Sequence, residues 1–143
     1  MYVVHEQMNA KRHRKLDAIA RKYRLFRRYG PARAKLGILC WGSSEGVVRD
    51  ALQRMNDPGV AAFIPRMLSP LPKADLQAFV DGCDDILIIE LSHSAQFHRV
   101  LRTEIDLPRG HTHVHARSGG KPLTMVEVID AVKTVCAPEE VLV

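Results

Sequence analysis

The sequence predicts an α/β fold, in which a mostly parallel sheet of about five strands forms the middle layer of a three-layer α/β/α sandwich. The first observation is the Ile-Leu-Ile-Ile run at residues 86–89, which is apolar without alternation. A strand of this kind has both faces covered, as in the centre of a parallel sheet. The second is that strand-like and helix-like patterns alternate along the chain, as in successive βαβ units. The third is size, because 143 residues with 46% hydrophobic and 26% charged residues suit one globular unit.

The N-terminal segment is expected to contain a helix and a short edge strand. Over residues 9–24, apolar side chains recur at helical spacing on a surface otherwise rich in lysine and arginine: Leu16, Ile19, Tyr23 and Phe26. Such a stripe requires a surface to dock on. Residues 24–29 alternate in polarity, as an edge strand with one wet face does, before Gly30 and Pro31 turn the chain.

A first βαβ unit is expected directly after this turn. Residues 36–41 predict a strand, residues 44–55 a helix with apolar side chains at helical spacing, and residues 60–65 a second strand. Pro72 is expected to begin the next helix, because proline suits the first turn of a helix.

The second half of the chain continues the alternation. We expect a buried strand over residues 86–91, a helix over residues 94–104 and a further strand over residues 112–116. Thr124 and Glu127 have the spacing of a capping box, so they predict the start of a last helix.

The net charge of +5 conceals an asymmetry between two parts of the chain. Residues 1–35 carry 11 Lys and Arg against two acidic residues, a balance of +9, whereas residues 36–143 carry 10 against 14, a balance of −4. We therefore divide the single globular unit into a basic N-terminal helix and edge strand, residues 1–35, and a domain of residues 36–143. The basic arm lacks a nucleic-acid-binding motif, so a solvated helix face or a protein partner is favoured over nucleic acid.

Cysteine usage and hydropathy predict a cytoplasmic protein without a cluster or metal of its own. Cys40, Cys83 and Cys136 are far apart, which is typical of reduced thiols and does not suit an iron–sulfur or structural zinc site. No run of about 18 apolar residues is present, and the N-terminus lacks the pattern of a signal peptide, so no membrane association is expected.

The turn after the first predicted parallel strand spells Gly42-x-Ser44-x-Gly46, which has three interpretations. One is the nucleophile elbow of a serine hydrolase, with Ser44 as nucleophile. A later aspartate and histidine are nominally available, from the set Asp84, Asp85, His93, His111, His113 and His115. This interpretation is weak, because no preceding strand or loop supplies the second oxyanion-hole donor. The second is an anion site at a helix N-terminus. The third, which we favour, is a strand-to-helix turn whose helix is capped by Ser43 or Ser44.

Polar residues follow the other buried strands and are expected at the same edge of the sheet. They are Arg66 after residues 60–65, and Glu90, Ser92, His93 and Gln96 after the apolar run. One interpretation is a ligand or subunit contact. The other is helix capping by Ser92 or Ser94, and the sequence does not separate the two.

Three histidines alternate with other residues near the end of the chain. In a strand, His111, His113 and His115 share one face, at a spacing of roughly 7 Å. Two of them have the spacing to bind a metal, but no alternating carboxylate or thiolate accompanies them. We therefore favour a solvent-facing histidine row and predict no metal.

Five motifs together resemble one protein family. They are residues 11–17 (KRHRKLD), 41–46 (WGSSEG), 65–72 (PRMLSPLP), 90–96 (ELSHSAQ) and 120–124 (GKPLT). In this order and over nearly the whole chain, they look like the C-terminal domain of the alpha subunit of 2-oxoacid:ferredoxin oxidoreductases, the 2-oxoglutarate type above all. The chain departs from the pattern at Ser92, where the family usually has Asn, and at Ala95, where it usually has Gly.

The resemblance implies a transketolase C-terminal-domain-like fold, with four parallel strands and an antiparallel edge strand that residues 24–29 match. Enzymes of this family oxidatively decarboxylate a 2-oxo acid on thiamine diphosphate with Mg²⁺. They pass electrons through iron–sulfur clusters to ferredoxin and the acyl group to coenzyme A. The resemblance places those cofactors on other domains or subunits, because this sequence lacks a Gly-Asp-Gly motif and clustered cysteines.

The chain is therefore expected to be an assembly domain of an oligomeric oxidoreductase, without catalytic residues and inactive in isolation. It is expected to be either a fragment or a split gene product. Four residues are candidates for lining the coenzyme A or active-site approach: Ser43, Arg66, His93 and Gln96. The alternatives are a free-standing α/β module that binds a small anion or nucleotide and, third, the hydrolase using Ser44.

Overall fold

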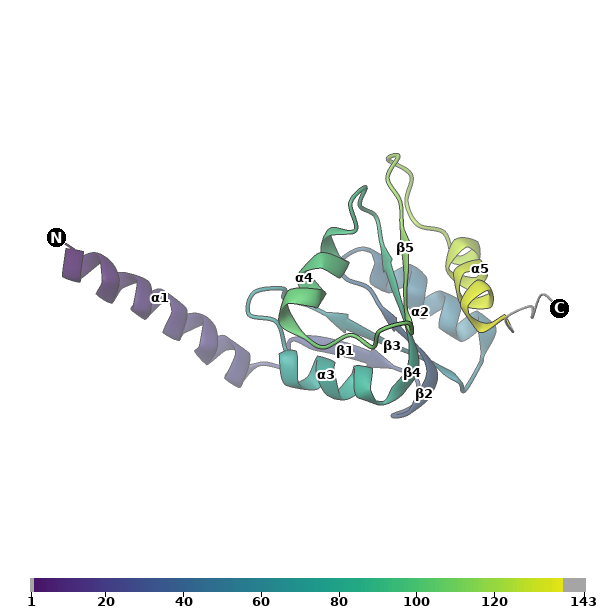
Figure 1. The fold of residues 1–143 in the computed structure, drawn as a ribbon, viewed down its shortest axis with the longest axis horizontal. Helices are drawn as coiled ribbons and strands as arrows, with labels where there is room; N and C mark the ends of the chain where they lie inside the picture. Colours follow the sequence, from purple (N-terminus) through teal and green to yellow (C-terminus); the bar gives the residue numbers. More distant parts are fainter. Residues whose placement is uncertain (1, 138–143) are drawn as a thin grey trace.

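The computed structural model describes residues 2–137 as a five-stranded sheet with helices on both faces, preceded by a long N-terminal helix (Figure 1). In chain order the elements are α1 (Tyr2–Lys22), β1 (Phe26–Tyr29), β2 (Ala34–Leu39), α2 (Ser44–Met55), β3 (Val60–Pro65), α3 (Lys73–Asp81), β4 (Cys83–Glu90), α4 (Gln96–Glu104), β5 (Thr112–Ala116) and α5 (Met125–Cys136).

The sheet has the strand order β1-β3-β2-β4-β5. Strands β3, β2, β4 and β5 run parallel, whereas β1 pairs with β3 in the antiparallel direction, with Phe26 opposite Pro65. The predicted mostly parallel sheet with one antiparallel edge strand is therefore confirmed. Parallel strands need crossover connections, which α2, α3 and α4 supply. Helix α5 follows the last strand.

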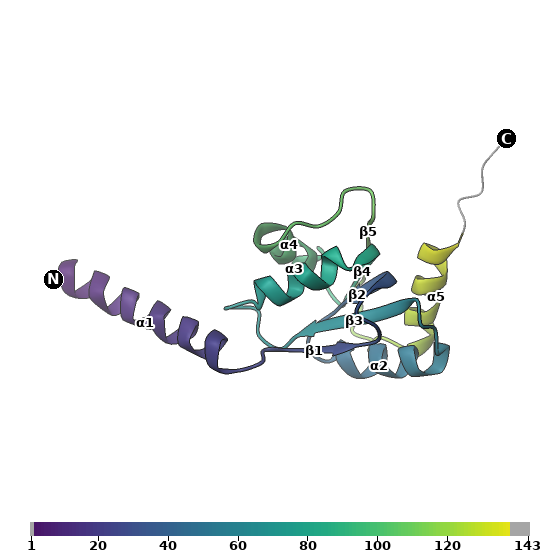
Figure 2. The same ribbon diagram turned by 90° about the horizontal axis from the view of Figure 1, so that it is seen from below.

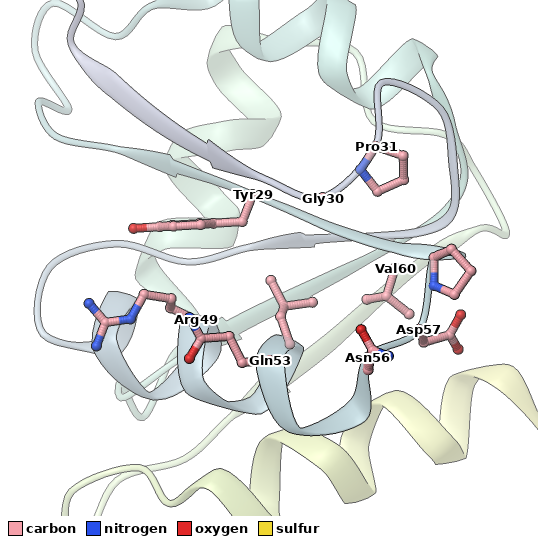
Figure 3. A pocket seen from close by; sticks show the side chains of 10 residues that line it. Tyr29, Gly30, Pro31, Arg49, Gln53, Asn56, Asp57 and Val60 are labelled. Atoms are coloured by element: carbon pink, nitrogen blue, oxygen red, sulfur yellow. The ribbon is translucent and has the colours of Figure 1, made fainter.

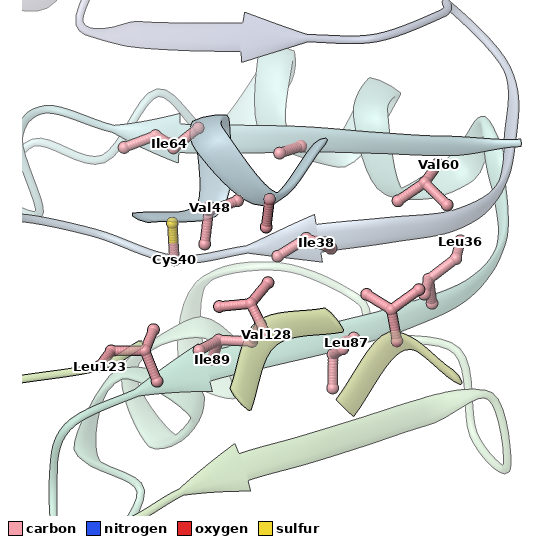
Figure 4. Close-up of a cluster of buried hydrophobic side chains, with 13 residues drawn as sticks. Leu36, Ile38, Cys40, Val48, Val60, Ile64, Leu87, Ile89, Leu123 and Val128 are labelled. Carbon is pink, nitrogen blue, oxygen red and sulfur yellow. The ribbon is translucent and has the colours of Figure 1, made fainter. Parts of the chain in front are cut away.

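Helices α2 and α5 cover one face of the sheet, and α3 and α4 cover the other (Figures 1 and 2). Alternate residues of each strand enter the two cores. In β2, for example, Leu36 and Ile38 pack with Val48 of α2 and Val128 of α5 (Figure 4), whereas Leu39 faces α3 and α4. This explains why the central strands are apolar without alternation.

Helix α1 extends away from the sheet as a separate rod (Figures 1 and 2). It begins at Tyr2, seven residues before the predicted start, and none of its residues is buried. Leu16, Ile19 and Tyr23 of the predicted apolar stripe therefore find no docking surface within residues 2–137, and Tyr23 stays 56% exposed. The prediction is wrong for Phe26, which begins β1 and stacks on Phe63. No helix among the described residues is long and apolar enough to cross a bilayer.

The predicted capping box at the start of α5 is confirmed. The Thr124 hydroxyl accepts a hydrogen bond from the backbone N–H of Glu127 (3.2 Å), and the Glu127 carboxylate accepts one from the backbone N–H of Thr124 (2.8 Å). Arg117 donates to both oxygens of the same carboxylate, at 2.6 and 3.0 Å. It also donates to the carbonyls of Lys121 and Pro122, so its guanidinium joins the segment between β5 and α5 to the first turn of α5.

These contacts predict an acid-dependent stability. The hydrogen bond from Arg117, followed by those from Thr124, lowers the pKa of Glu127 from 4.5 to about 2. A lowered pKa stabilises the fold above the ordinary value, and this contribution is lost as the pH falls through the folded value. Glu127→Gln is thus expected to melt below the unsubstituted protein at pH 7, with the gap closing between pH 4.5 and 2. Because the side chain is 31% exposed, solvent screening keeps the gap modest.

Thermal melts by circular dichroism across this pH range provide the measurement. Asp130→Asn is the matched control, because it removes a carboxylate from an exposed position of the same helix. A difference in melting temperature between Glu127→Gln and the unsubstituted protein that stays constant from pH 7 to pH 2 would contradict a stabilising role of the ionised Glu127 carboxylate.

Candidate functional site

The candidate site lies at the carboxyl ends of β2, β3 and β4. Because these strands are adjacent and parallel, the segments that follow them meet at one edge of the sheet. The sequence-based expectation that Ser43, Arg66 and Glu90 share this edge is confirmed by the topology. We call the segments of residues 41–45, 66–69 and 90–96 the carboxyl edge.

The turn between β2 and α2 is built without a side-chain cap. Gly42 has a φ of 62°, and a Cβ added there would meet nothing within 4 Å. Ser43 holds the N-cap position but has helical angles, φ −65° and ψ −16°, and its side chain makes no capping bond. The predicted cap by Ser43 or Ser44 is therefore wrong, because a side-chain cap requires an extended backbone at that position. Instead the Glu45 N–H donates to the Gly42 carbonyl at 3.2 Å.

The geometry of this turn is not that of a nucleophile elbow. An elbow places its serine on a sharp, strained turn. Among residues 2–137, the only residues other than glycine with positive φ are Asn56 and Ala95, so Ser44 is unstrained. Ser44 is also buried, at 6% exposure, and no hydrogen bond between it and a histidine is present in the described part of the chain. Ser44 therefore belongs to no serine-hydrolase constellation within residues 2–137.

A charged cluster that the sequence analysis missed surrounds Glu45 in the first turn of α2. The Tyr29 hydroxyl donates to Glu45 Oε1 at 2.8 Å, and Arg27 Nη1 lies 3.3 Å from the same oxygen. Arg66 Nη2 lies 3.8 Å from Oε2. The antiparallel pairing of β1 with β3 places Arg27 opposite Ile64, near the carboxyl end of β3, and Tyr29 opposite Ala62, on the face of the sheet that α2 covers. The sequence analysis missed the cluster because the pairing joins residues 33 to 39 positions apart, and a single sequence does not specify such a register.

Two hollows flank Trp41 at the carboxyl edge. A hollow of about 580 Å³ is lined by polar groups of Gly42, Glu45 and Arg66 and by the apolar segment Ile64, Pro65, Met67 and Leu68. A smaller one of about 170 Å³ lies toward β4 and is lined by Ser43, Ser44, Glu90 and Leu91. Trp41 borders both and remains 46% exposed, with its ring 6.3 Å from that of Phe97. The edge therefore offers an aromatic surface between a hollow of mixed lining and a smaller one toward β4.

Glu90 is a structural cap for α4. Its side chain is 2% exposed, and its two oxygens accept hydrogen bonds from the backbone N–H groups of Phe97 (2.9 Å) and His98 (3.0 Å). Ser92 Oγ accepts from the N–H of Gln96 at 2.9 Å, so Ser92 satisfies a donor of the first turn of α4, as one of the two open interpretations held, although the N-cap residue itself is Ala95. A buried carboxylate at a helix N-terminus is stabilised by these donors and by the helix dipole.

The exposed residues of this segment are positioned for contact. His93 and Gln96 are exposed, and the N-cap residue Ala95 has a left-handed conformation with φ 50°. Their predicted role as ligand or subunit contacts, like that of Ser43 and Arg66, stays a prediction. Further along α4, burial, followed by the charge of Arg102, lowers the pKa of His98.

The predicted histidine row is only partly solvent-facing. His111 Nδ1 and His113 Nε2 each lie 3.1 Å from Asp85 Oδ1, a carboxylate that the neighbouring strand β4 supplies. His115 lies opposite Ile89, on the face that α2 and α5 cover, and its Nε2 is buried without a hydrogen-bond partner. No group of three or more metal-ligating side chains occurs in residues 2–137.

A further hollow lies at the opposite edge of the sheet, between the β1–β2 turn and the C-terminal half of α2 (Figure 3). It measures about 500 Å³, and Tyr29, Pro31 and Val60 form an apolar floor beside Gln53 and Asn56. None of the predicted site residues lies there.

Comparison with known proteins identifies relatives of this domain. The family described as pyruvate:ferredoxin oxidoreductase core domain II matches residues 34–128. The 2-oxoacid:ferredoxin oxidoreductase subunit alpha of Saccharolobus solfataricus is 28% identical over 109 residues, which cover 75% of this chain and 17% of that protein. Subunit alpha of 2-oxoacid:ferredoxin oxidoreductase 2 from Aeropyrum pernix is 26% identical over 138 residues, covering 93% of this chain and 21% of that protein. The chain thus spans about a fifth of the length of these relatives.

Solved structures agree with these relationships. The 2-oxoglutarate:ferredoxin oxidoreductase from Magnetococcus marinus, solved with 2-oxoglutarate, coenzyme A and succinyl-CoA bound, superimposes with a TM-score of 0.82 and 31% identity. The match covers 92% of this chain and 23% of that one. A split gene transketolase in an inactive beta4 tetramer shares the fold alone, with a TM-score of 0.54 at 16% identity over 76% of this chain and 41% of that one.

Proposed function

Because the chain belongs to the pyruvate:ferredoxin oxidoreductase core domain II family, we propose that it is an assembly domain for the alpha subunit of a 2-oxoacid:ferredoxin oxidoreductase. In this role it stabilises a complex that oxidatively decarboxylates a 2-oxo acid, reduces ferredoxin and forms an acyl-CoA. The observation that carries the proposal is the family match over residues 34–128. The chain itself contributes surfaces to the reaction and no catalytic group.

The residues of this chain do not fit the cofactors that such an enzyme uses. Cys40 is buried, and burial raises the pKa of its thiol to about 12, which disfavours the thiolate that a cluster or metal requires. Cys83 belongs to β4 and Cys136 to the end of α5. We therefore assign iron–sulfur clusters to the partner domains or subunits, and we place thiamine diphosphate and Mg²⁺ there as well because the family resemblance implies it.

We assign the carboxyl edge to the approach of coenzyme A or to a subunit contact. Ser43, Arg66, His93 and Gln96 are exposed on it, and Trp41 offers an apolar face between them. Crevices at the carboxyl ends of parallel strands are the usual ligand sites of open α/β sheets. The enzyme from Magnetococcus marinus, which matches this domain over 23% of its chain, was solved with coenzyme A bound, and this supports the proposal.

Helix α1 is assigned to the interface with the partner domains. It presents Met8, Leu16 and Ile19 toward one side, and Tyr23 follows directly after its end, without a cover among the described residues. An uncovered apolar stripe on a highly charged helix is stabilised only by packing against another surface. The basic flank of the helix suits an acidic partner surface.

The test is reconstitution with the remaining subunits. We expect the chain to co-elute with them in gel filtration and the complex to reduce a viologen dye in the presence of 2-oxo acid and coenzyme A. Ile19→Asp on the apolar stripe is expected to weaken co-elution, whereas Ala10→Asp on the opposite side of α1 is the matched control. A complex that assembles fully and is fully active without this chain would refute the assembly role.

A further inference from the structure

Four arginines line a hollow at the edge strand β1. The hollow measures about 400 Å³, and its lining consists of four arginines and two aromatic residues: Arg24, Arg27, Arg28, Arg66, Phe26 and Tyr29. We call it the arginine pocket. Strand β1 lies outside the five sequence motifs of the family resemblance. Of the residues that line the pocket, only Arg66 was also assigned to the contact at the carboxyl edge.

Two of the arginines are fixed by aromatic rings. The Arg24 guanidinium lies 4.7 Å from the centre of the Phe26 ring, which stacks on Phe63. The Arg28 guanidinium lies 5.1 Å from the centre of the Phe79 ring and donates to the carbonyls of Pro31 and Ala32. Both hydrogen bonds of Arg28 use Nη2, and the residue lies opposite Phe63, on the side of the sheet that α3 covers. Arg24 has no carboxylate partner among the described residues.

The other two arginines share a single carboxylate. Arg27 and Arg66 contact Glu45 through one nitrogen each, at 3.3 and 3.8 Å, and they stay 51% and 48% exposed. Each guanidinium carries five donors in a planar fork, so most of their donors are free. The four arginines and the Glu45 carboxylate sum to an excess of three positive charges, with Arg27 and Arg66 on the α2 side of β1 and Arg24 and Arg28 on its α3 side.

We propose that the arginine pocket binds the phosphate group of a phosphorylated small molecule. A phosphate monoester carries about −1.5 to −2 charges at pH 7 and three acceptor oxygens, which match the free donors of Arg24, Arg27 and Arg66. A single carboxylate neutralises less of the excess charge and offers two oxygens. Because Arg66 also lines the hollow beside Trp41, a ligand held by its phosphate here can extend onto the carboxyl edge.

Isothermal titration calorimetry of the full chain tests this proposal without the partner subunits. The ligands are inorganic phosphate, adenosine 3′,5′-bisphosphate and adenosine, each at low and at moderate salt. We expect both phosphates to bind, with the bisphosphate tighter, and adenosine to give no heat. Binding is expected to weaken with salt, because exposed charges are screened within a Debye length of about 10 Å at 0.1 M.

Variants connect the binding to the pocket. Arg27→Gln and Arg66→Gln are each expected to weaken phosphate binding about tenfold, the loss of one charge-assisted contact. Arg99→Gln removes the same charge from an exposed position on α4 and is expected to leave the affinity unchanged. Circular dichroism melts show whether each variant is folded. Arg24→Gln leaves the contacts of Glu45 with Arg27 and Arg66 in place, so it is a second test of phosphate binding that does not unpair this carboxylate.

Three results would overturn the proposal. They are no phosphate binding at millimolar concentration, equal weakening by Arg99→Gln, and binding of a tetra-aspartate peptide as tight as that of the bisphosphate, which indicates an acidic protein partner. Failure of this titration leaves the co-elution experiment unaffected, because that experiment depends on α1 and not on the arginine pocket.

Discussion

Replacement of Phe63 by alanine is expected to lower the free energy of unfolding by about 3–5 kcal/mol. Phe63 lies in β3, is 1% exposed, and its ring lies between two others. It stacks on Phe26 of β1 at 4.6 Å and meets Phe79 of α3 at 5.5 Å. Alanine leaves a cavity at this junction and removes two aromatic pairs, each of which contributes about 0.5–1.5 kcal/mol beyond its buried area.

Urea denaturation followed by tryptophan fluorescence and circular dichroism provides the measurement. Phe63→Leu retains most of the side-chain volume and is expected to lower the free energy of unfolding clearly less than Phe63→Ala does. Val126→Ala, at a position 62% exposed, is the surface control and is expected to lie within about 0.5 kcal/mol of the unsubstituted protein. Hydrogen exchange is expected to accelerate first in β1, which depends on Phe63 for its aromatic contact. A loss below about 1 kcal/mol for Phe63→Ala would contradict the packing.

The fold was predictable wherever burial imposes a regular pattern. The expected helix at 44–55 and strands at 60–65 and 112–116 coincide with α2, β3 and β5. The start of α1 was missed because an exposed helix needs no apolar period, so its first turns carry no signal. Strand β4 begins at Cys83, three residues before the apolar run, because its first residues are only half-buried or exposed.

Strand β2 shows why boundaries are harder to predict than elements. It covers Ala34–Leu39, whereas the apolar run suggested 36–41. Cys40 is buried below the turn and Trp41 lies exposed beside two hollows, so both are apolar for reasons other than strand pairing. Apolar character marks burial or a binding surface as readily as it marks a strand.

The candidate site was predictable in its position and not in its contacts. Topology brings Ser43, Arg66 and Glu90 to one edge, and this follows from the strand pattern. Contacts across strands do not follow from it. The pairing of Glu45 with Tyr29 and Arg27, and that of Asp85 with His111 and His113, depend on strand order and register, which a single sequence does not specify.

Glu90→Ala is expected to lower the free energy of unfolding by about 3 kcal/mol, as the second large effect. The carboxylate is buried and accepts the N–H groups of Phe97 and His98, so its removal leaves two donors at the start of α4 without a partner. Each unsatisfied buried donor costs about 1–3 kcal/mol, and hydrogen bonds to a charged group are the stronger kind. Glu90→Gln keeps one acceptor oxygen, so its free energy of unfolding is expected to lie between those of Glu90→Ala and the unsubstituted protein.

The neighbouring Ala95 provides a control of opposite sign in the same turn. Its φ of 50° lies in the left-handed region, which costs an alanine about 1–2 kcal/mol. Glycine removes this strain but adds about 0.4–1 kcal/mol of unfolded-state entropy, so Ala95→Gly is expected to stabilise the protein by about 0.5–1 kcal/mol. Urea denaturation separates the two variants, because they move the midpoint in opposite directions. Equal stability of Glu90→Ala and the unsubstituted protein would mean that the carboxylate does not cap α4, and Glu90 would then return to the set of ligand contacts at the carboxyl edge.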